Sequence, residues 1–234
     1  MDDDFKRPAH RQVLAALQQL NSEFLEQCEI FFGGGTRIVL ELGEYRESRD
    51  LDFLCSSQAG YRLLRESVSE KSLGQVAKQT LALSRDIRAD LYGVRTWLAL
   101  PALKLKLEIL REARIPVAGI RVARLPVACL DRPHAFAEKF LANADRGMDA
   151  STLSRDAIDL AFMVEGWTIA DAEAGFEIAR SAYGSDIDRK LANVTAKLRT
   201  DRKYRSQCVD GMAITDTRTL SRGLEVLARG LTPK

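Results

Sequence analysis

The sequence has few of the residues on which histidine- or cysteine-based chemistry depends. It contains two histidines, His10 and His134, and four widely spaced cysteines without a CxxC pair. Structural zinc sites and disulfide frameworks use closer or more regular ligand spacing. A Ser-His-Asp site needs a histidine held beside a nucleophile. The composition therefore disfavours zinc, disulfide and catalytic-triad chemistry.

The chain also lacks a charge excess and long apolar runs. Thirty-five Lys and Arg residues nearly balance 33 Asp and Glu residues, so the 234-residue chain offers no bulk polycation to nucleic acid or membrane. Its apolar runs are far shorter than the ~20 residues of a membrane span. The N-terminus is acidic and has no apolar signal segment. We expect a cytoplasmic globular protein with no membrane partner.

Hydrophobic periodicity divides the chain into a mixed first half and a helical second half. The first half predicts helices at 8–27, 36–42 and 61–68, and strands at 29–32, 50–54, 79–83, 94–98 and 103–109. The second half predicts helices at 133–143, 154–165, 169–181, 186–199 and 218–229. This pattern indicates an α+β domain over 1–130 followed by an α-helical domain over 131–234.

A triple glycine separates the strand at 29–32 from the next helix. Gly33, Gly34 and Gly35 are followed by Thr36, which we expect to cap that helix. Backbone without Cβ atoms can approach a phosphate closely, and a helix N-terminus presents free N–H groups to it. The alternative is a tight strand-to-helix connection without a ligand.

Two acids alternate with apolar residues in the next predicted strand. Asp50 and Asp52 share one face of an extended chain, whereas Leu51 and Phe53 share the other. Paired carboxylates are costly unless a cation lies between them, and Mg²⁺ prefers oxygen ligands. The alternative is an exposed edge strand with solvated acids.

A third carboxylate follows on the strand at 103–109. Its leucines occupy one face, and Glu108 lies on the other face with Lys104 and Lys106. Glu108 would complete a site for two metal ions, or would form a surface ion pair with one of those lysines. Asp90, in another possible strand, is the rival for the third carboxylate, although the alternation around Glu108 is cleaner.

The helical half carries a further charged group. Asp156 and Asp159 are three residues apart and share a helix face, and Lys139 lies on the preceding predicted helix. Lysine suits a triphosphate, and a carboxylate could orient a nucleotide or assist deprotonation. The alternative is a set of routine salt bridges between helices.

Taken in order, these motifs resemble a known family. Gly34-Gly35-Thr36, a helix and then Arg46-Glu47-Ser48-Arg49-Asp50-Leu51-Asp52-Phe53 resemble the GG[ST]…RxSxDLDF signature of the DNA polymerase β-type nucleotidyltransferase superfamily. More narrowly, the chain is similar to the AbiEii/AbiGii toxin family of type IV toxin–antitoxin systems. That family continues with a KxEI strand, a lysine helix and an RDxxDL motif, matched by Lys106–Ile109, Glu138-Lys139 and Arg155–Leu160.

The resemblance implies a nucleotidyltransferase fold, a small mixed sheet flanked by helices, with a helical domain after it. It implies transfer of a nucleoside monophosphate from an NTP to an acceptor hydroxyl, with two Mg²⁺ ions, or Mn²⁺, held by Asp50, Asp52 and Glu108. Asp156 would join these three as a catalytic residue. The implied nucleotide-binding residues are Gly34, Gly35, Thr36, Arg46, Ser48, Lys139, Arg155 and Asp159.

The acceptor is less constrained by the sequence. Residues 197–205 hold five basic residues and one acid around Tyr204, which favours an RNA acceptor such as tRNA or else forms a solvated helix face. A small molecule or a protein as acceptor, or a nucleotide-binding module without turnover, remain alternatives. Family resemblance further implies a cognate antitoxin encoded nearby.

Overall fold

The computed structural model describes residues 5–101 and 103–231, which form parts of two compact units. Unit 1 comprises Met1–Glu41 and Ser48–Asp131, and unit 2 comprises Leu42–Glu47 and Arg132–Lys234. The linear division into 1–130 and 131–234 stays a prediction. Within the described ranges, no helix has the length and apolarity needed to cross a membrane.

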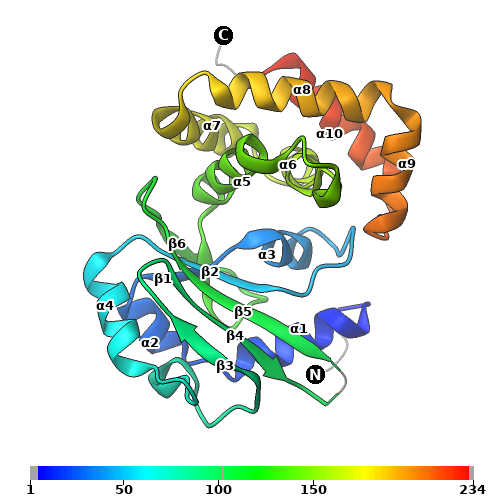
Figure 1. The fold of residues 1–234 in the computed structure, drawn as a ribbon. Helices are drawn as coiled ribbons and strands as arrows, with labels where there is room; N and C mark the ends of the chain where they lie inside the picture. The colour runs from blue at the N-terminus through cyan, green and yellow to red at the C-terminus, as the bar shows by residue number, and fades with distance from the viewer. Residues whose placement is uncertain (1–4, 102, 232–234) are drawn as a thin grey trace. The chain divides into compact units, whose positions relative to one another are not determined.

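Unit 1 is built on a seven-stranded mixed sheet with the order β3-β4-β5-β2-β1-β7-β6 (Figure 1). Strands β2 and β5 are parallel, as are β1 and β7, and the other neighbours are antiparallel. The strands are β1 (Ile30–Phe32), β2 (Leu51–Cys55), β3 (Leu83–Ala89), β4 (Gly93–Ala99), β5 (Lys104–Arg111), β6 (Gly119–Arg121) and β7 (Ala128–Leu130). The helices are α1 (Pro8–Gln18), α2 (Ser22–Gln27), α3 (Gly34–Glu41), α4 (Gln58–Ser67) and the short η1 (Gly74–Val76).

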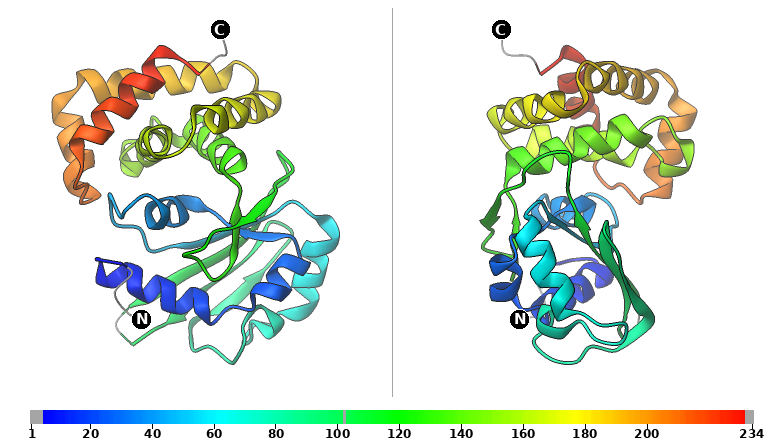
Figure 2. Two further views of the ribbon diagram at one scale, coloured as in Figure 1. Left: turned by 180° about the vertical axis from the view of Figure 1, so that it is seen from behind. Right: turned by 60° about the vertical axis from the view of Figure 1, so that its left-hand side comes forward.

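Strand alternation decides which face of this sheet is buried. In β5 the residues Leu105, Leu107 and Ile109 are buried and join one hydrophobic core with Leu51 and Phe53 of β2. Residues of α1, α2 and α4 complete that core on the same side of the sheet (Figure 2). The polar residues of β2 and β5 therefore face away from these helices.

Several local predictions for unit 1 are wrong in detail. The predicted helix over 8–27 is two helices: α1 ends at Gln18, and Asn21 caps α2 by accepting a hydrogen bond from the Phe24 N–H at 3.2 Å. Residues 79–83 do not form the expected strand, since β3 begins only at Leu83. Strands β6 and β7 were not predicted, because each has three residues and too little alternation to be recognised.

Unit 2 is helical and includes one segment from the first half of the chain. Its helices are α5 (Arg132–Arg146), η2 (Ala150–Thr152), α6 (Arg155–Gly166), α7 (Ile169–Tyr183), α8 (Asp186–Thr200), α9 (Arg202–Gly211) and α10 (Thr217–Arg229). Helix α5 packs against α6, α7 and α8, and α10 packs against α6 and α8. The five helices predicted for this half are present. Helix α9 was missed, because its sequence is too polar to show an apolar stripe.

The segment Leu42–Glu47 is held within unit 2 by backbone and aromatic contacts. The Glu47 N–H donates to the Met212 carbonyl at 3.1 Å, and the Thr215 N–H donates to the Tyr45 carbonyl at 3.0 Å. The Tyr45 ring stacks on Phe162 of α6 with 3.8 Å between centroids. These contacts give six residues from the first half of the sequence a fixed place among the helices of unit 2.

Candidate active site

The glycine turn between β1 and α3 lies directly against an acid of β2. Gly34 has φ +65°, and a Cβ atom there would lie 2.4 Å from Asp52 Oδ2. The Gly33 N–H donates to the Asp52 backbone carbonyl at 2.8 Å. Only glycine meets both the positive φ and the close approach at position 34. The turn and the acid therefore form one local structure.

This turn also corrects the expected start of the helix. Helix α3 begins at Gly34, so Thr36 lies in the first turn of the helix and is not its cap. The positive φ of Gly34 lets the chain turn from the strand into the helix without an intervening capping residue. Gly35 lies in the same first turn.

A row of charged side chains crosses three neighbouring strands of unit 1. In the sheet register Asp52 of β2 is paired with Glu108 of β5, and Glu108 is paired with Arg95 of β4. Residues paired across a sheet have side chains on the same face. We call Asp52, Glu108 and Arg95 the carboxylate row. It lies on the sheet face opposite α1, α2 and α4.

Glu108 is paired with cations within this row. Lys106 Nζ lies 2.5 Å from Glu108 Oε2, and Arg95 Nε lies 3.4 Å from Oε1. The ion pair with Lys106, one of the two alternatives for Glu108, is thus present. The Glu108 side chain is about 15% exposed, so these cations partly neutralise it near the surface.

Asp90 lies in a turn and reaches the row only through Arg95, whose Nη1 is 3.3 Å from Asp90 Oδ2. It follows β3, and its Oδ1 accepts hydrogen bonds from the backbone N–H groups of Tyr92 and Gly93 at 2.7 and 3.0 Å. The Tyr92 N–H lowers the pKa of the Asp90 carboxyl more than any other contact does. The sheet register pairs Glu108, and not Asp90, with Asp52.

The sheet topology excludes the edge-strand alternative for the paired acids. Strand β2 lies between β5 and β1 and is therefore internal. Asp52 lies in β2, whereas Asp50 precedes its first residue, so strand alternation does not fix the direction of the Asp50 side chain. Both acids are half-buried.

The donor chemistry of this region fits magnesium. Among the residues that the structure describes, no group of three or more His, Cys, Asp or Glu side chains is gathered for a metal ion. Magnesium, however, is commonly held by one or two carboxylates together with substrate phosphates. Neighbouring carboxylates at Asp52 and Glu108, with Asp52 packed against Gly34, meet the carboxylate part of that requirement.

Thr36 and Ser48 of unit 1 form a hydrogen-bonded pair next to the glycine turn, which we call the polar brace. Thr36 is fully buried, and its hydroxyl lies 2.8 Å from the Ser48 hydroxyl. The Ser48 backbone N–H donates to His10 Nε2 at 3.2 Å. Both Thr36 and Ser48 were predicted to contact nucleotide, and their roles stay predictions. His10 was missed because a single histidine in a helix gives no distinctive sequence signal.

Unit 2 holds a second group of charged residues, which is buried. Arg46 donates from Nε and Nη2 to the two carboxylate oxygens of Asp159 at 2.7 and 2.8 Å. The Tyr45 hydroxyl donates to Asp159 Oδ1 at 2.6 Å, and Lys139 Nζ lies 2.7 Å from Oδ2. Burial opposes ionisation of Asp159, but Arg46 and Lys139 outweigh it and lower the pKa of that carboxyl.

Asp156 extends this group by one helical turn. It accepts from Lys139 Nζ at 2.9 Å and from Arg146 Nε at 2.7 Å. Burial alone would raise the pKa of the Asp156 carboxyl, yet the two cations hold it well below its usual range. We call Tyr45, Arg46, Lys139, Asp156 and Asp159, together with Arg146 at its partly exposed edge, the buried ionic cluster. The salt bridges weighed as an alternative for Asp156, Asp159 and Lys139 are thus present.

The sequence did not predict that Tyr45 belongs to the buried ionic cluster, and it did not predict which residue Arg46 binds there. Tyr45 was not predicted to take part at all, and Arg46 was predicted to bind nucleotide. In the structure Arg46 pairs with Asp159, 113 positions further along the chain. Arg155, the first residue of α6, is half-buried. The nucleotide-binding roles of these residues stay predictions.

The basic stretch at 197–205 is divided between two helices. Lys197 Nζ lies 3.7 Å from the centre of the Tyr204 ring, and Arg199 makes a two-bond ion pair with Glu225. Arg205 donates to the Ser221 hydroxyl at 2.5 Å. Arg202 and Lys203, at the start of α9, are exposed. Three of the five basic side chains thus have partners within unit 2.

Comparison with known proteins bears on the same features. The family model described as nucleotidyl transferase AbiEii toxin, type IV TA system, matches residues 15–213. Among solved structures, a candidate nucleotidyltransferase from H. pylori is 18% identical with a TM-score of 0.56, and the match covers 95% of this chain and 92% of that one. JHP933 from Helicobacter pylori is 17% identical with a TM-score of 0.52, covering 97% and 93%. No curated protein matches.

These two solved structures share the fold, and the family model spans the glycine turn, the carboxylate row and the RDxxDL helix. The expected fold and activity class are therefore confirmed. The chain is a nucleotidyltransferase that belongs to the AbiEii toxin family of type IV toxin–antitoxin systems.

Proposed function

We propose that the protein transfers a nucleoside monophosphate from an NTP to an acceptor hydroxyl at the carboxylate row, in a magnesium-dependent reaction. The observation that supports this most is the pairing of Asp52 with Glu108 on parallel strands, with Gly34 packed against the Asp52 carboxylate. It places two metal-type ligands directly beside the turn that begins helix α3, whose N–H groups would meet the phosphates.

Asp50, Asp52 and Glu108 are the residues that would hold magnesium. When bound, the metal would supply charge neutralisation at the phosphates and a lower pKa for the attacking hydroxyl. Gly34 and Gly35 would bring backbone N–H groups of the first turn of α3 to the triphosphate. The polar brace of Thr36 and Ser48 keeps this turn in place.

The bond changes of the proposed reaction balance without a further reactant. The acceptor hydroxyl oxygen forms a bond to the α-phosphorus, the bond from that phosphorus to the bridging oxygen breaks, and pyrophosphate leaves. Glu108 accepts the hydroxyl proton. Lys106 and Arg95, which pair with Glu108, are suited to pair with phosphate oxygens in its place.

The buried ionic cluster serves a different purpose in this proposal. Asp156 and Asp159 are 1% and 0% exposed, and each already binds two cations. A direct contact with nucleotide would require these strong ion pairs to break. We therefore give Lys139, Arg46 and Asp159 the role of fixing α5, α6 and the segment Leu42–Glu47 to one another.

RNA is the acceptor class we propose. Exposed Arg202 and Lys203, together with half-buried Arg205, give α9 a basic start that could meet phosphates. Binding of RNA through such contacts should weaken steeply as salt concentration rises. The double variant Arg202→Gln, Lys203→Gln should show a weaker dependence of RNA affinity on salt than the unchanged protein. The same dependence in both proteins would exclude the start of α9 as the RNA-binding surface.

Labelled NTPs test the activity and the acceptor together. The protein is incubated with each α-phosphate-labelled NTP in turn, with magnesium or with EDTA, and with purified tRNA or total RNA. Magnesium-dependent transfer of label to RNA is expected. Label on the protein itself or on a small molecule would contradict the RNA acceptor, and nucleotide binding without transfer would contradict catalysis.

A cognate antitoxin encoded nearby is the partner that we propose from the family. Expression of the chain alone should slow growth of a bacterial host, and Asp52→Asn should restore it because the proposed metal ligand is lost. If the unchanged chain and Asp52→Asn inhibit growth equally at equal protein levels, toxicity does not depend on the transfer reaction.

A further inference from the structure

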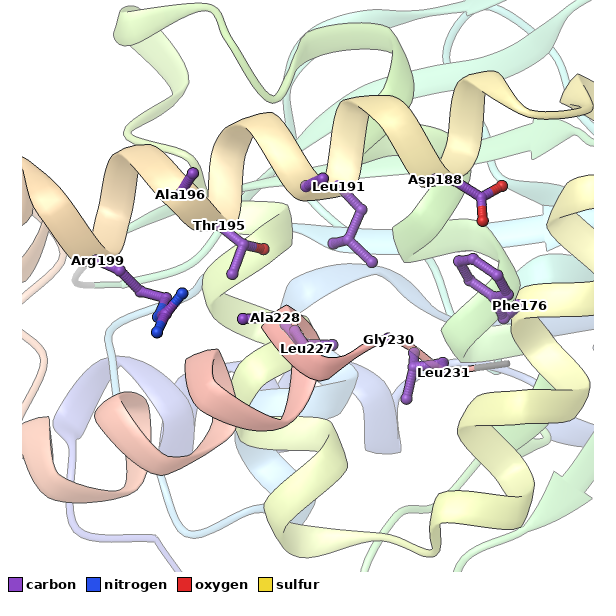
Figure 3. A pocket seen from close by; sticks show the side chains of 11 residues that line it. Phe176, Asp188, Leu191, Thr195, Ala196, Arg199, Leu227, Ala228, Gly230 and Leu231 are labelled. Carbon is purple, nitrogen blue, oxygen red and sulfur yellow. The ribbon is translucent and has the colours of Figure 1, made fainter. Parts of the chain in front are cut away.

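The charged side chains that line the cavity of unit 2 are already paired. This cavity of about 320 Å³ lies between α8, the end of α10 and Phe176 of α7 (Figure 3). Its arginine, Arg199, makes two hydrogen bonds to Glu225 at 2.9 and 2.8 Å. Its acid, Asp188, pairs with Arg180 Nε at 3.3 Å. Both charges of the lining are thus engaged, in contrast to those of a pocket in unit 1.

That pocket has a volume of about 410 Å³ and lies where β5 ends, beside α4. Leu91, in the turn between β3 and β4, and Arg111, the last residue of β5, form part of its lining. The other lining residues recur every three or four positions and so share one face of α4: Gln58, Tyr61, Arg62, Arg65 and Glu66. We call this the arginine pocket. Small-molecule sites typically enclose about 300 to 1,000 Å³.

Hydrogen bonds between the three elements hold the arginine pocket in shape. The Tyr61 hydroxyl of α4 donates to the Asp90 backbone carbonyl at 2.7 Å. The Arg111 backbone N–H of β5 donates to the Tyr92 carbonyl at 2.9 Å. The turn that carries Leu91 is therefore bound both to α4 and to β5. A ligand that enters a preformed pocket loses less free energy to the ordering of loops and side chains.

Two of the three arginines in this pocket have no hydrogen-bond or ion-pair partner within the part of the chain that the structure describes. These are Arg65 and Arg111, and both are exposed. Arg62 Nε lies 3.6 Å from Glu66 Oε1, and both of these side chains are more than half exposed. Burial raises the pKa of Tyr61, and the charge of Arg65 opposes this rise, so the Arg65 guanidinium acts on the hydroxyl that binds the turn. The pocket thus offers accessible cations to a ligand.

The charges of the lining favour an anion with more than one negative charge. Three arginines face one glutamate, which leaves a net charge of +2. Asp90, in the adjoining turn, already accepts two backbone N–H groups and pairs with Arg95. A phosphate monoester carries close to −2 at pH 7 and offers three oxygens, and arginine binds such groups through two parallel hydrogen bonds. Phosphate therefore matches the lining better than a carboxylate does.

An apolar side chain borders these cations. Leu91 is 64% exposed, and its neighbour Tyr92 is 73% exposed. Among the residues that the structure describes, no other two large hydrophobic side chains with such exposure are adjacent in sequence. Exposed apolar surface beside a pocket is typical of a binding site. The ligand of the arginine pocket should therefore have an apolar body in addition to its anionic group.

We propose that the arginine pocket binds a phosphate monoester with a small apolar body. The phosphate oxygens bond Arg65 and Arg111, and the body covers Leu91. Arg111 follows Ile109 in the alternation of β5, so it belongs to the face of the sheet opposite the carboxylate row. The site is therefore independent of the transfer reaction proposed above, and its test needs neither magnesium nor an NTP.

Matched probes measure the two parts of this ligand separately. Binding of phenyl phosphate, inorganic phosphate and phenol to the full chain is measured by titration calorimetry in the presence of EDTA, so that no metal-bound phosphate contributes. Phenyl phosphate should bind about tenfold more tightly than either inorganic phosphate or phenol, because each of these lacks one part of the ligand. Equal binding of phenyl phosphate and inorganic phosphate, or no saturable binding of phenyl phosphate, would overturn the proposal.

Substitutions locate the site. Arg65→Gln and Arg111→Gln should each weaken the binding of phenyl phosphate about tenfold, because a charged hydrogen-bond donor is lost. Leu91→Ser should weaken phenyl phosphate and leave inorganic phosphate unchanged. Arg88→Gln, which changes an exposed arginine of β3 outside the pocket lining, is the control and should bind phenyl phosphate as the unchanged protein does. Equal losses in Arg88→Gln and Arg65→Gln would mean that general electrostatic attraction is responsible, and would overturn the site.

RNA is the competing ligand class, since its phosphodiesters also bind arginine. The affinity of the full chain for RNA should be the same in Arg65→Gln as in the unchanged protein. If Arg65→Gln instead weakens RNA more than it weakens phenyl phosphate, the arginine pocket belongs to an RNA-binding surface and the proposal of a small phosphate ligand is wrong.

Discussion

The carboxylate row of unit 1 and the buried ionic cluster of unit 2 contain the same kinds of residue in different surroundings. In the row, Glu108 keeps about 15% of its side chain exposed and pairs with Lys106, which is about 36% exposed. In the cluster, Asp159 is fully buried, with an arginine, a lysine and a tyrosine around it. Exposed pairs exchange partners at little cost, whereas buried pairs do not.

The difference separates residues that can bind a ligand from residues that hold the fold. The resemblance made Asp52 a metal ligand and Asp159 a nucleotide-binding residue, so both were expected at the active site. Asp52 is half-buried against the glycine turn, whereas Asp159 is fully buried and its charge is balanced by Arg46 and Lys139. Four changes would sharpen or break this contrast.

Removing the carboxylate of Asp159 should have the largest effect on stability. Asp159→Ala leaves Arg46 and Lys139 buried without their shared acid, which should lower the free energy of unfolding by about 3–5 kcal/mol. Urea unfolding measures this. Asp210→Ala, an exposed acid of α9, is the control and should change stability by less than about 0.5 kcal/mol. Equal effects of the two changes would remove the contrast.

Neutralising Asp52 should affect activity and not stability. Asp52→Asn keeps the shape of the side chain but removes a proposed metal ligand, so nucleotide transfer should fall by about a hundred- to a thousandfold. The unfolding temperature should stay close to that of the unchanged protein. Asp90→Asn, in the turn after β3, is the matched control and should retain most activity. A larger loss in Asp90→Asn would transfer the third-carboxylate role to that residue.

Adding one methyl group at Gly34 should disturb the site through backbone and contact together. Gly34→Ala combines an unfavourable φ of +65° with a Cβ atom 2.4 Å from Asp52 Oδ2. The backbone alone should cost about 1–2 kcal/mol. Gly43→Ala has φ +80° with no atom within 4 Å of the added Cβ, so it incurs only the backbone cost. Transfer should fail in Gly34→Ala and persist in Gly43→Ala; parallel losses would show that strain alone is responsible.

Acid should weaken the buried ionic cluster gradually. The pKa of Asp156 is lowered in the folded protein, so its contribution to stability is fully present above the unfolded value near 4 and is lost as pH falls below it. Each proton taken up on unfolding changes stability by about 1.4 kcal/mol per pH unit. Urea unfolding between pH 7 and pH 2.5 should show this decline, with a smaller slope in Asp156→Asn. If the free energy of unfolding falls equally with pH in Asp156→Asn and in the unchanged protein, acids other than Asp156 determine the acid sensitivity of the fold.

The sequence predicted local features better than pairings between distant segments. The alternation of β5 correctly placed Leu105, Leu107 and Ile109 on the buried face, because strand period depends only on neighbouring residues. The register of Asp52 with Glu108 joins residues 56 positions apart in sequence, and no local pattern specifies it. For the same reason no local pattern pointed to the ion pair of Arg46 with Asp159, 113 positions further along the chain.

The segment Leu42–Glu47 has a consequence for attempts to exchange parts of this protein with relatives. It lies in sequence between the glycine turn and β2, yet Tyr45 and Arg46 bind Asp159 of α6. A chimera that joins this N-terminal half to another helical half at residue 131 would therefore bring a foreign Tyr-Arg pair to the new α6. Compatible grafts must carry these six residues along with the C-terminal half, so the chain has no single position at which it can be recombined cleanly.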